Sequence, residues 1–140
     1  MSRSIMDIII HTHDRSVLEG KTAYVAIIPF GGEVKSDLFQ GKILPGAVDR
    51  QIIDANGIKH MSARYMLEGT DSQGNSCKIY IENSGDFSLD GPRPFRTIPI
   101  FYTDSPVLAD YLHTNRFRGE GHREGDVLTI KIFDLWETTT

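Results

Sequence analysis

Two charged side chains with the potential for chemistry, Asp49 and Arg64, stand in successive strand-like segments. Arginine presents a planar fork of N–H donors that suits a carboxylate, an enolate or a phosphate. An aspartate beside it can act as a general base, or it can simply hold the arginine in place. Because an isolated buried charge is costly, pairing alone also explains both residues. The sequence therefore predicts either a polar pocket or a structural ion pair.

The placement of Arg64 depends on which face of its strand is buried. Side chains alternate across a strand, so Asp49 and Gln51 share one face, whereas Arg64 lies opposite the apolar face of its own strand. If that apolar face packs outward, Arg64 points into the interior beside Asp49. If the apolar face forms the core, Arg64 is in solvent. Our hypothesis places five residues in one ligand-binding pocket: Asp49, Gln51, Arg64, Asn83 and Arg96.

Histidines offer a second set of chemical groups. His113 ends a short expected helix, and together with Asp49 it is our candidate for acid–base chemistry. His11 and His13 stand two residues apart, which can place both imidazoles on one metal. Nothing near them completes a site, and no HExxH motif or Cys–His pair accompanies them. We expect no metal and no cofactor.

The elements that must position these residues are mostly short strands. Stretches rich in Ile, Val, Thr, Tyr and Phe alternate with clusters of Gly, Asn, Asp and Pro. One helix is expected from Pro106 to about Thr114, since Asp104 or Ser105 can cap it. Gly85 to Pro94 is expected to form a surface loop. The expected strands are Ile5–His11, Lys21–Phe30, Leu38–Leu44, Val48–Asp54, Lys59–Glu68, Ser76–Glu82, Ile98–Thr103, Arg116–Gly119 and Val127–Trp136.

The connections between these strands favour antiparallel pairing. The turns at Asp54–Gly57 and Asp71–Asn75 supply residues that tolerate the positive φ of hairpin loops. The strand spacing fits a sandwich or a barrel, and polar residues opposite apolar faces favour a barrel that encloses a ligand cavity. We predict an all-β fold, with one domain spanning residues 1–140. It is a single antiparallel β-barrel of about 8–10 strands with one short helix near the C-terminus.

Composition narrows the function classes. The chain has 140 residues, of which 39% are hydrophobic and 24% charged, as in ordinary globular proteins. Its net charge of -4 and scattered basic residues give no long-range attraction to nucleic acid. The apolar stretch from Ile5 to Ile10 is too short for a signal peptide or a membrane span. The lone Cys77 cannot form an internal disulfide. We expect a cytoplasmic protein with neither nucleic acid nor membrane as a partner.

A series of short motifs, in a fixed order and spacing, carries a family resemblance from about Thr22 to Leu135. It resembles the domain-of-unknown-function family 3237, also called uncharacterised protein family 0311. The resemblance implies a small, mainly bacterial antiparallel β-barrel with no established general activity. The motifs are Gly31-Gly32, Phe39-Gln-Gly41, Leu44-Pro45-Gly46-Ala-Val-Asp49-Arg-Gln51, Ala63-Arg64-Tyr65, Tyr80-Ile-Glu-Asn83-Ser-Gly85, Tyr111-Leu112 and Phe117-Arg-Gly119-Glu-Gly121.

Two departures from the family pattern fall at or beside candidate site residues. The family's Asp-Trp-Gln segment corresponds to Asp49, Arg50 and Gln51, so Arg50 replaces an aromatic residue. Its Trp-Leu-Asn segment corresponds to residues 111–113, so His113 replaces an amide.

Three functional hypotheses remain open at this point. The first is a protein that binds a small anionic or carbonyl-bearing molecule inside the barrel. The second is an enzyme in the same pocket, in which Asp49 or His113 moves a proton and an arginine stabilises negative charge on oxygen. The third is a homo-oligomeric interaction protein without a ligand. A cavity lined by Asp49 and Arg64 would retain the first two, whereas a filled interior would remove both.

Overall fold

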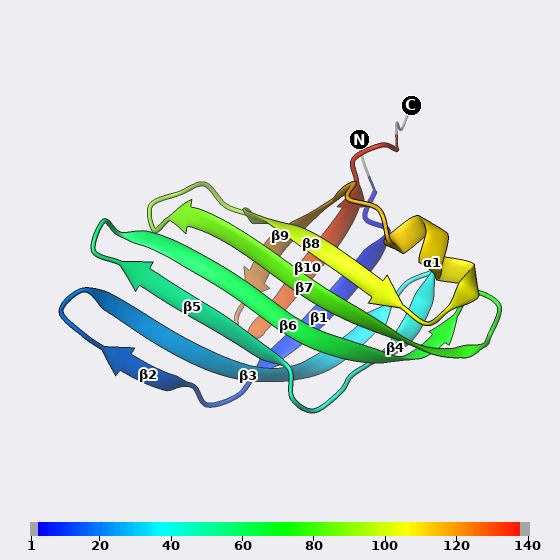
Figure 1. Cartoon of the computed structure of the whole chain (residues 1–140), viewed down its shortest axis with the longest axis horizontal. Helices are drawn as coiled ribbons and strands as arrows, with labels where there is room; N and C mark the ends of the chain where they lie inside the picture. Colours follow the sequence, from blue (N-terminus) through cyan, green and yellow to red (C-terminus); the bar gives the residue numbers. More distant parts are fainter. Residues whose placement is uncertain (1–2, 138–140) are drawn as a thin grey trace.

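The computed structural model describes residues 3–137, which form ten strands and one helix (Figure 1). The ends of the expected domain, residues 1–2 and 138–140, lie outside the described residues. The elements are β1 (Met6–Thr12), β2 (Ser16–Glu19), β3 (Ala23–Lys35), β4 (Phe39–Ile43), β5 (Val48–Asp54), β6 (Ile58–Asp71), β7 (Ser76–Ser88), β8 (Phe95–Thr103), α1 (Pro106–Leu112), β9 (Phe117–Glu124) and β10 (Val127–Asp134).

All strands belong to one antiparallel sheet, and the sheet closes on itself because β1 pairs with both β10 and β3. β1 and β2 run along one edge of β3, while β4 and β5 run along its other edge. Each of these pairs therefore acts as one long, bent strand, and the result is a closed eight-stranded barrel. The predicted all-β barrel with one short helix near the C-terminus is confirmed.

Several strands differ from the expected pattern. β3 continues to Lys35, β6 continues to Asp71, and β8 begins at Phe95. β7 continues to Ser88 and β9 continues to Glu124, although both stretches are rich in glycine and polar residues. β2 was not expected at all. These segments are held by pairing with neighbours, since β7 is paired with β6 along its whole length and β9 with β10. Cross-strand pairing outweighs intrinsic propensity in such segments.

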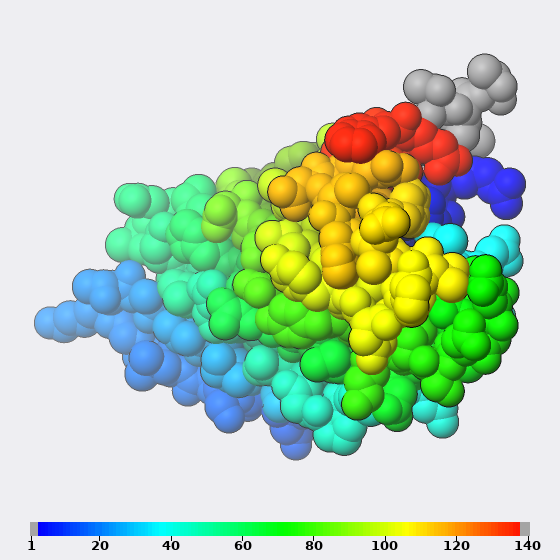
Figure 2. Space-filling model, turned by 45° about the vertical axis from the view of Figure 1, so that its right-hand side comes forward, coloured from blue at the N-terminus to red at the C-terminus, as the bar shows by residue number. Residues whose placement is uncertain are grey.

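The helix α1 covers one end of the barrel. The Ser105 side chain accepts a hydrogen bond from the Leu108 amide and so caps the first turn, which begins at Pro106. Leu108 and Leu112 point into the barrel end, and the segment around α1 closes it (Figure 2). We call this the plugged end. Its apolar core contains Met6, Val34, Phe39, Leu67, Ile79, Phe101, Leu108, Leu112, Phe117 and Ile132.

The opposite end of the barrel is formed by the β5–β6 turn, the β7–β8 loop and the β9–β10 turn (Figure 1). Gly57 in the first of these turns has a φ of 78°, as the sequence predicts for that hairpin. This end is hollow, and we call it the open end. Within residues 3–137, no helix is both long and apolar enough to cross a membrane.

Candidate functional site

The open end contains a cavity of about 810 Å³, a size typical of small-molecule sites. It is lined by side chains from most strands of the barrel and from the β7–β8 loop. Much of the wall is apolar. The apolar wall residues are Ile10, Ile28, Met61, Phe87, Phe95, Leu128 and Ile130.

Aspartate, alanine and asparagine form a row across three neighbouring strands of the cavity wall. Asp49 in β5 lies opposite Ala63 in β6, and Ala63 lies opposite Asn83 in β7. The small Ala63 side chain leaves room between the two polar groups. Gln51 lines the cavity as well, and its Nε2 donates a hydrogen bond to Asp49 Oδ2 at 2.8 Å. Three of the predicted site residues, Asp49, Gln51 and Asn83, therefore line one cavity.

Tyr65 joins Asp49 and Asn83 in a group of polar side chains that we call the polar floor. Asp49 Oδ1, the Tyr65 hydroxyl and Asn83 Oδ1 are buried, and none has a hydrogen-bond partner among residues 3–137. Unpaired polar atoms are unfavourable in an interior, and native proteins keep few of them. In a ligand-sized cavity, such atoms can serve as partners for a ligand's polar group.

The electrostatics of the polar floor follow from burial. Burial raises the pKa of the Asp49 carboxyl, although the hydrogen bond from Gln51 and the charge of Lys59 act in the opposite direction. Burial and the nearby negative charge of Asp49 together raise the pKa of the Tyr65 hydroxyl. The Asp49 carboxyl is therefore easier to protonate than an exposed aspartate, and Tyr65 keeps its proton.

Four basic side chains, Arg15, Lys59, Arg93 and Arg123, line the mouth of the cavity, and we call them the basic rim. Each comes from a different segment of the chain. Burial lowers the pKa of Lys59, Asp49 opposes this, and the positive charges of the three arginines lower it further. The rim charges are thus close enough to act on one another. The lining contains two acidic residues, Asp49 and Glu124, against four basic ones, so the charge of the site is net positive.

Two aromatic rings, Phe87 and Phe95, form one wall of the cavity. Their rings are stacked with centroids 5.5 Å apart. Phe95 lies flat against β9 because Gly121 has no side chain, and a Cβ there would overlap the Phe95 ring. Ring packing inside the barrel therefore explains why position 121 is a glycine.

Arg64 and Arg96 do not line the cavity, which corrects their expected place in the pocket. The Arg64 side chain is 60% exposed, and its Nε lies 3.7 Å from Glu82 Oε1 on the outer face. Arg96 is also exposed on the outer face of β8. The reason is that the apolar face of β6, with Met61 and Ala63, forms the interior, which is the second of the two alternatives considered for this strand. Arg64 is consequently in solvent.

His113, the other acid–base candidate, lies at the plugged end and outside the cavity lining. Its Nε2 accepts a hydrogen bond from the Thr103 backbone N–H at 2.9 Å. Its own backbone N–H donates to the Ala109 carbonyl, which ends the helix. The contacts of His113 tie α1 to the end of β8.

The basic rim was missed by sequence reasoning, although two of its members carried a usable signal. Lys59 lies two residues before Met61, so strand alternation alone places it on the interior face of β6. Arg123 lies two residues after Gly121 and shares its face, but it stands beyond the expected strand Arg116–Gly119. Arg15 and Arg93 lie outside regular strands, and no periodic pattern could place them.

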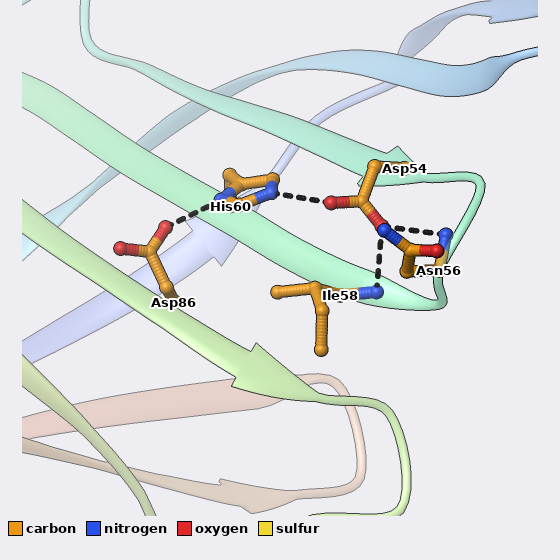
Figure 3. Close-up of polar contacts among 5 residues, drawn as sticks. All are labelled: Asp54, Asn56, Ile58, His60 and Asp86. Atoms are coloured by element: carbon orange, nitrogen blue, oxygen red, sulfur yellow. Dashed lines mark hydrogen bonds and ion pairs between the residues drawn. The ribbon is translucent and has the colours of Figure 1, made fainter.

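A second polar cluster lies on the outer surface near the open end (Figure 3). His60 Nδ1 lies 2.6 Å from Asp86 Oδ1, and His60 Nε2 lies 2.9 Å from Asp54 Oδ2. The hydrogen bonds to Asp54 and Asp86 raise the pKa of His60. A protonated His60 can donate to both carboxylates, and it thereby joins the β5–β6 turn to β7. Within the described residues, no group of three or more His, Cys, Asp or Glu side chains is arranged to hold a metal ion.

Comparison with known proteins places the chain in a family. A family model described as "Protein of unknown function (DUF3237)" matches residues 5–135. A UPF0311 protein of Clostridium acetobutylicum is 36% identical over 114 residues, which cover 68% of this chain and 70% of the relative. A UPF0311 protein of Rhodopseudomonas palustris is 40% identical over 125 residues, with 78% of both proteins covered.

A solved structure agrees with these sequence matches. The crystal structure of a Clostridium acetobutylicum protein of unknown function superposes with a TM-score of 0.76 at 28% identity, covering 96% of this chain and 95% of that one. The resemblance inferred from the short motifs is thus confirmed. This chain belongs to the DUF3237 family, also known as UPF0311.

Proposed function

We propose that this protein binds a small molecule with an acidic group, such as a carboxylate, inside the open end of its barrel. The observation that carries the proposal is the basic rim above a partly apolar cavity. Arginine and lysine at the mouth suit an oxyanion, while the aromatic and aliphatic walls suit an apolar body. The anionic ligand of our first hypothesis is retained, but the basic rim replaces Arg64 and Arg96 as its partner.

The test is binding of a fluorescent probe, the anionic and apolar dye anilinonaphthalene sulfonate. We expect the dye to bind, and we expect decanoate to displace it. A double variant, Lys59→Gln with Arg123→Gln, removes two rim charges and should weaken both affinities about tenfold or more, which corresponds to about 1.4 kcal/mol.

The matched control is the double variant Arg64→Gln with Arg96→Gln. It removes the same amount of charge from the outer face, so it should leave both affinities unchanged. If both double variants weaken binding equally, the attraction is a general effect of net charge. The basic rim would then have no special role, and the proposal would fail.

A second candidate function is acid–base catalysis in the same cavity. It is favoured by the environments of Asp49 and Lys59, because burial raises the pKa of the first and lowers that of the second. Such shifts bring an acid and a base towards neutral pH, as catalytic proton transfer requires. A metabolite screen for turnover should then find activity that Asp49→Asn abolishes while binding of the same compound survives. Loss of binding without any turnover would favour a binding protein.

The outer face of β6, β7 and β8 supports the third hypothesis, self-association. Met66, Tyr80 and Tyr102 are neighbours across the three strands, and β8 also exposes Ile98 and Ile100. Exposed apolar patches of this kind occur at interfaces between subunits. Light scattering at micromolar concentration should show an oligomer that Ile98→Asp dissociates, and a monomeric wild-type protein would remove this proposal.

A further inference from the structure

Charge is separated along the axis of the cavity. The rim carries Arg15, Lys59, Arg93 and Arg123, whereas the polar floor carries the Asp49 carboxyl. Asp49 lies near the neutral Tyr65, which is 3% exposed, and Asn83, which is 2% exposed, lies two strands away beyond Ala63. A molecule in this cavity therefore meets positive charge at one end and negative charge at the other.

This separation dictates the direction in which an acid enters. A second carboxylate at the floor would be placed against Asp49 in a poorly solvated interior, where like charges repel strongly. The acidic group of the ligand must therefore remain at the basic rim. Arginine N–H groups can pair with it there in two-point contacts.

The floor in turn selects the opposite end of the ligand. An ionised Asp49 only accepts hydrogen bonds, so its partner must donate one. A cationic donor is disfavoured, because basic residues outnumber acidic ones in the lining. A hydroxyl group is neutral, donates to a carboxylate, and can accept from the Tyr65 hydroxyl. It would give partners to polar atoms that have none among the described residues.

We propose that the ligand is an amphiphilic hydroxy acid, with its carboxylate at the basic rim and its hydroxyl hydrogen-bonded to Asp49 at the polar floor. The walls of the cavity, including Met61 and the stacked Phe87 and Phe95, hold the apolar body between these two ends. This inference rests on the proposed function and specifies the class of molecule that the cavity selects.

The test compares three probes with the same chain length: decanoate, ω-hydroxydecanoate and decanedioate. Their affinities are measured by displacement of anilinonaphthalene sulfonate and by calorimetry. We expect ω-hydroxydecanoate to bind about tenfold more tightly than decanoate. The reason is that the free energy gained by a hydrogen bond to the charged Asp49 exceeds the cost of removing water from the hydroxyl group. Decanedioate should bind more weakly than decanoate, because its second carboxylate meets Asp49.

The variant Asp49→Asn should abolish this order of affinities. The hydroxy acid loses its advantage over decanoate, and decanedioate loses its disadvantage. The matched control is Glu82→Gln, which removes one negative charge from the exposed partner of Arg64 on the outer face. It should leave the order unchanged. Thermal unfolding of both variants checks that they are folded, and the order of the three wild-type affinities stands as an independent readout.

The outcomes separate this inference from the proposed function. If decanoate binds as tightly as ω-hydroxydecanoate, or if decanedioate binds most tightly, the hydroxy-acid inference is wrong while an anion-binding cavity remains. If neither the dye nor any of the three acids binds, both proposals fail. If the hydroxy acid binds best but Asp49→Asn preserves its advantage, the hydroxyl does not reach Asp49 and the inference is also wrong.

Discussion

The two ends of the barrel are built from the same strands but differ in their interiors, which are filled with apolar side chains at one end and hollow and partly polar at the other. At the plugged end, residues such as Phe101, Leu112 and Ile132 are almost wholly buried and form one apolar cluster. At the open end, the same interior faces change to Asp49, Asn83 and Lys59 around a cavity. One end therefore supplies stability, while the other carries polar groups that stability alone does not require.

Two buried aspartates show the same contrast at the level of single groups. Burial raises the pKa of Asp134, but hydrogen bonds from Arg116 and Tyr111 outweigh that effect, so the pKa lies below its ordinary value of 3.8. Arg116 binds it through two nitrogens at 3.1 and 2.7 Å. Among residues 3–137, Asp49 has only the hydrogen bond from Gln51, and its pKa lies above 3.8. One carboxylate is fully paired, and the other has capacity to bind something else.

The largest effect is expected from truncating an aromatic ring at each end. Phe101→Ala, at the plugged end, should lower the free energy of unfolding by about 3–5 kcal/mol, because a dense core cannot collapse around the lost ring. Phe87→Ala, in the cavity wall, should cost about 1–2 kcal/mol, since that ring already borders empty space. Urea unfolding measures both. Equal losses of stability would mean that the two ends are packed equally densely, which would contradict the contrast between the plugged end and the open end.

The next effect concerns the paired aspartate. Asp134→Ala should lower the free energy of unfolding by about 3 kcal/mol at neutral pH, because Arg116 and Tyr111 lose their hydrogen-bond partner. Because the folded pKa is lowered, the stabilisation by Asp134 is present above pH 3.8 and is lost as the pH falls through the folded pKa. The stabilities of wild type and variant should therefore converge as the pH falls through the folded pKa of Asp134, which lies below 3.8. Parallel curves would contradict the ion pair.

The unpaired aspartate should behave in the opposite way. Asp49→Asn is expected to raise the free energy of unfolding at neutral pH by about 1 kcal/mol, as in other sites where a functional group reduces stability. The folded pKa of Asp49 is raised, so its ionisation destabilises the fold as the pH rises above 3.8. At low pH the variant and the wild type should be equally stable. A less stable variant at pH 7 would show that Asp49 has a structural role.

The smallest effect is expected at the surface cluster of the open end. A protonated His60 donates hydrogen bonds to Asp54 and Asp86, and these raise its pKa above 6.5. Its stabilisation is fully present below pH 6.5 and is lost as the pH rises through the folded pKa. The Tm of the wild type should therefore fall slightly as the pH rises above 6.5, and this fall should be absent in His60→Gln. A wild-type Tm that is flat between pH 6 and pH 9 would contradict this contribution.

The short-range patterns of the sequence were sufficient for much of the fold. Turn residues and alternating strands predicted the antiparallel barrel, and proline with a capping serine predicted the helix. Strand alternation also grouped Asp49 with Gln51, since side-chain direction in a strand is a local property. The extensions of β7 and β9 were not predictable in this way, because they depend on partners elsewhere in the sheet.

Local sequence patterns were enough to identify most of the strands and the residues that share each face. Which face became the interior was decided only by closure of the barrel, because closure buries the face that best fills the enclosed space. That choice put Arg64 in solvent and Tyr65 beside Asp49. Closure also brought Arg15, Lys59, Arg93 and Arg123 to one mouth. These residues are far apart in the chain, so only the tertiary structure could assemble their charges around the cavity.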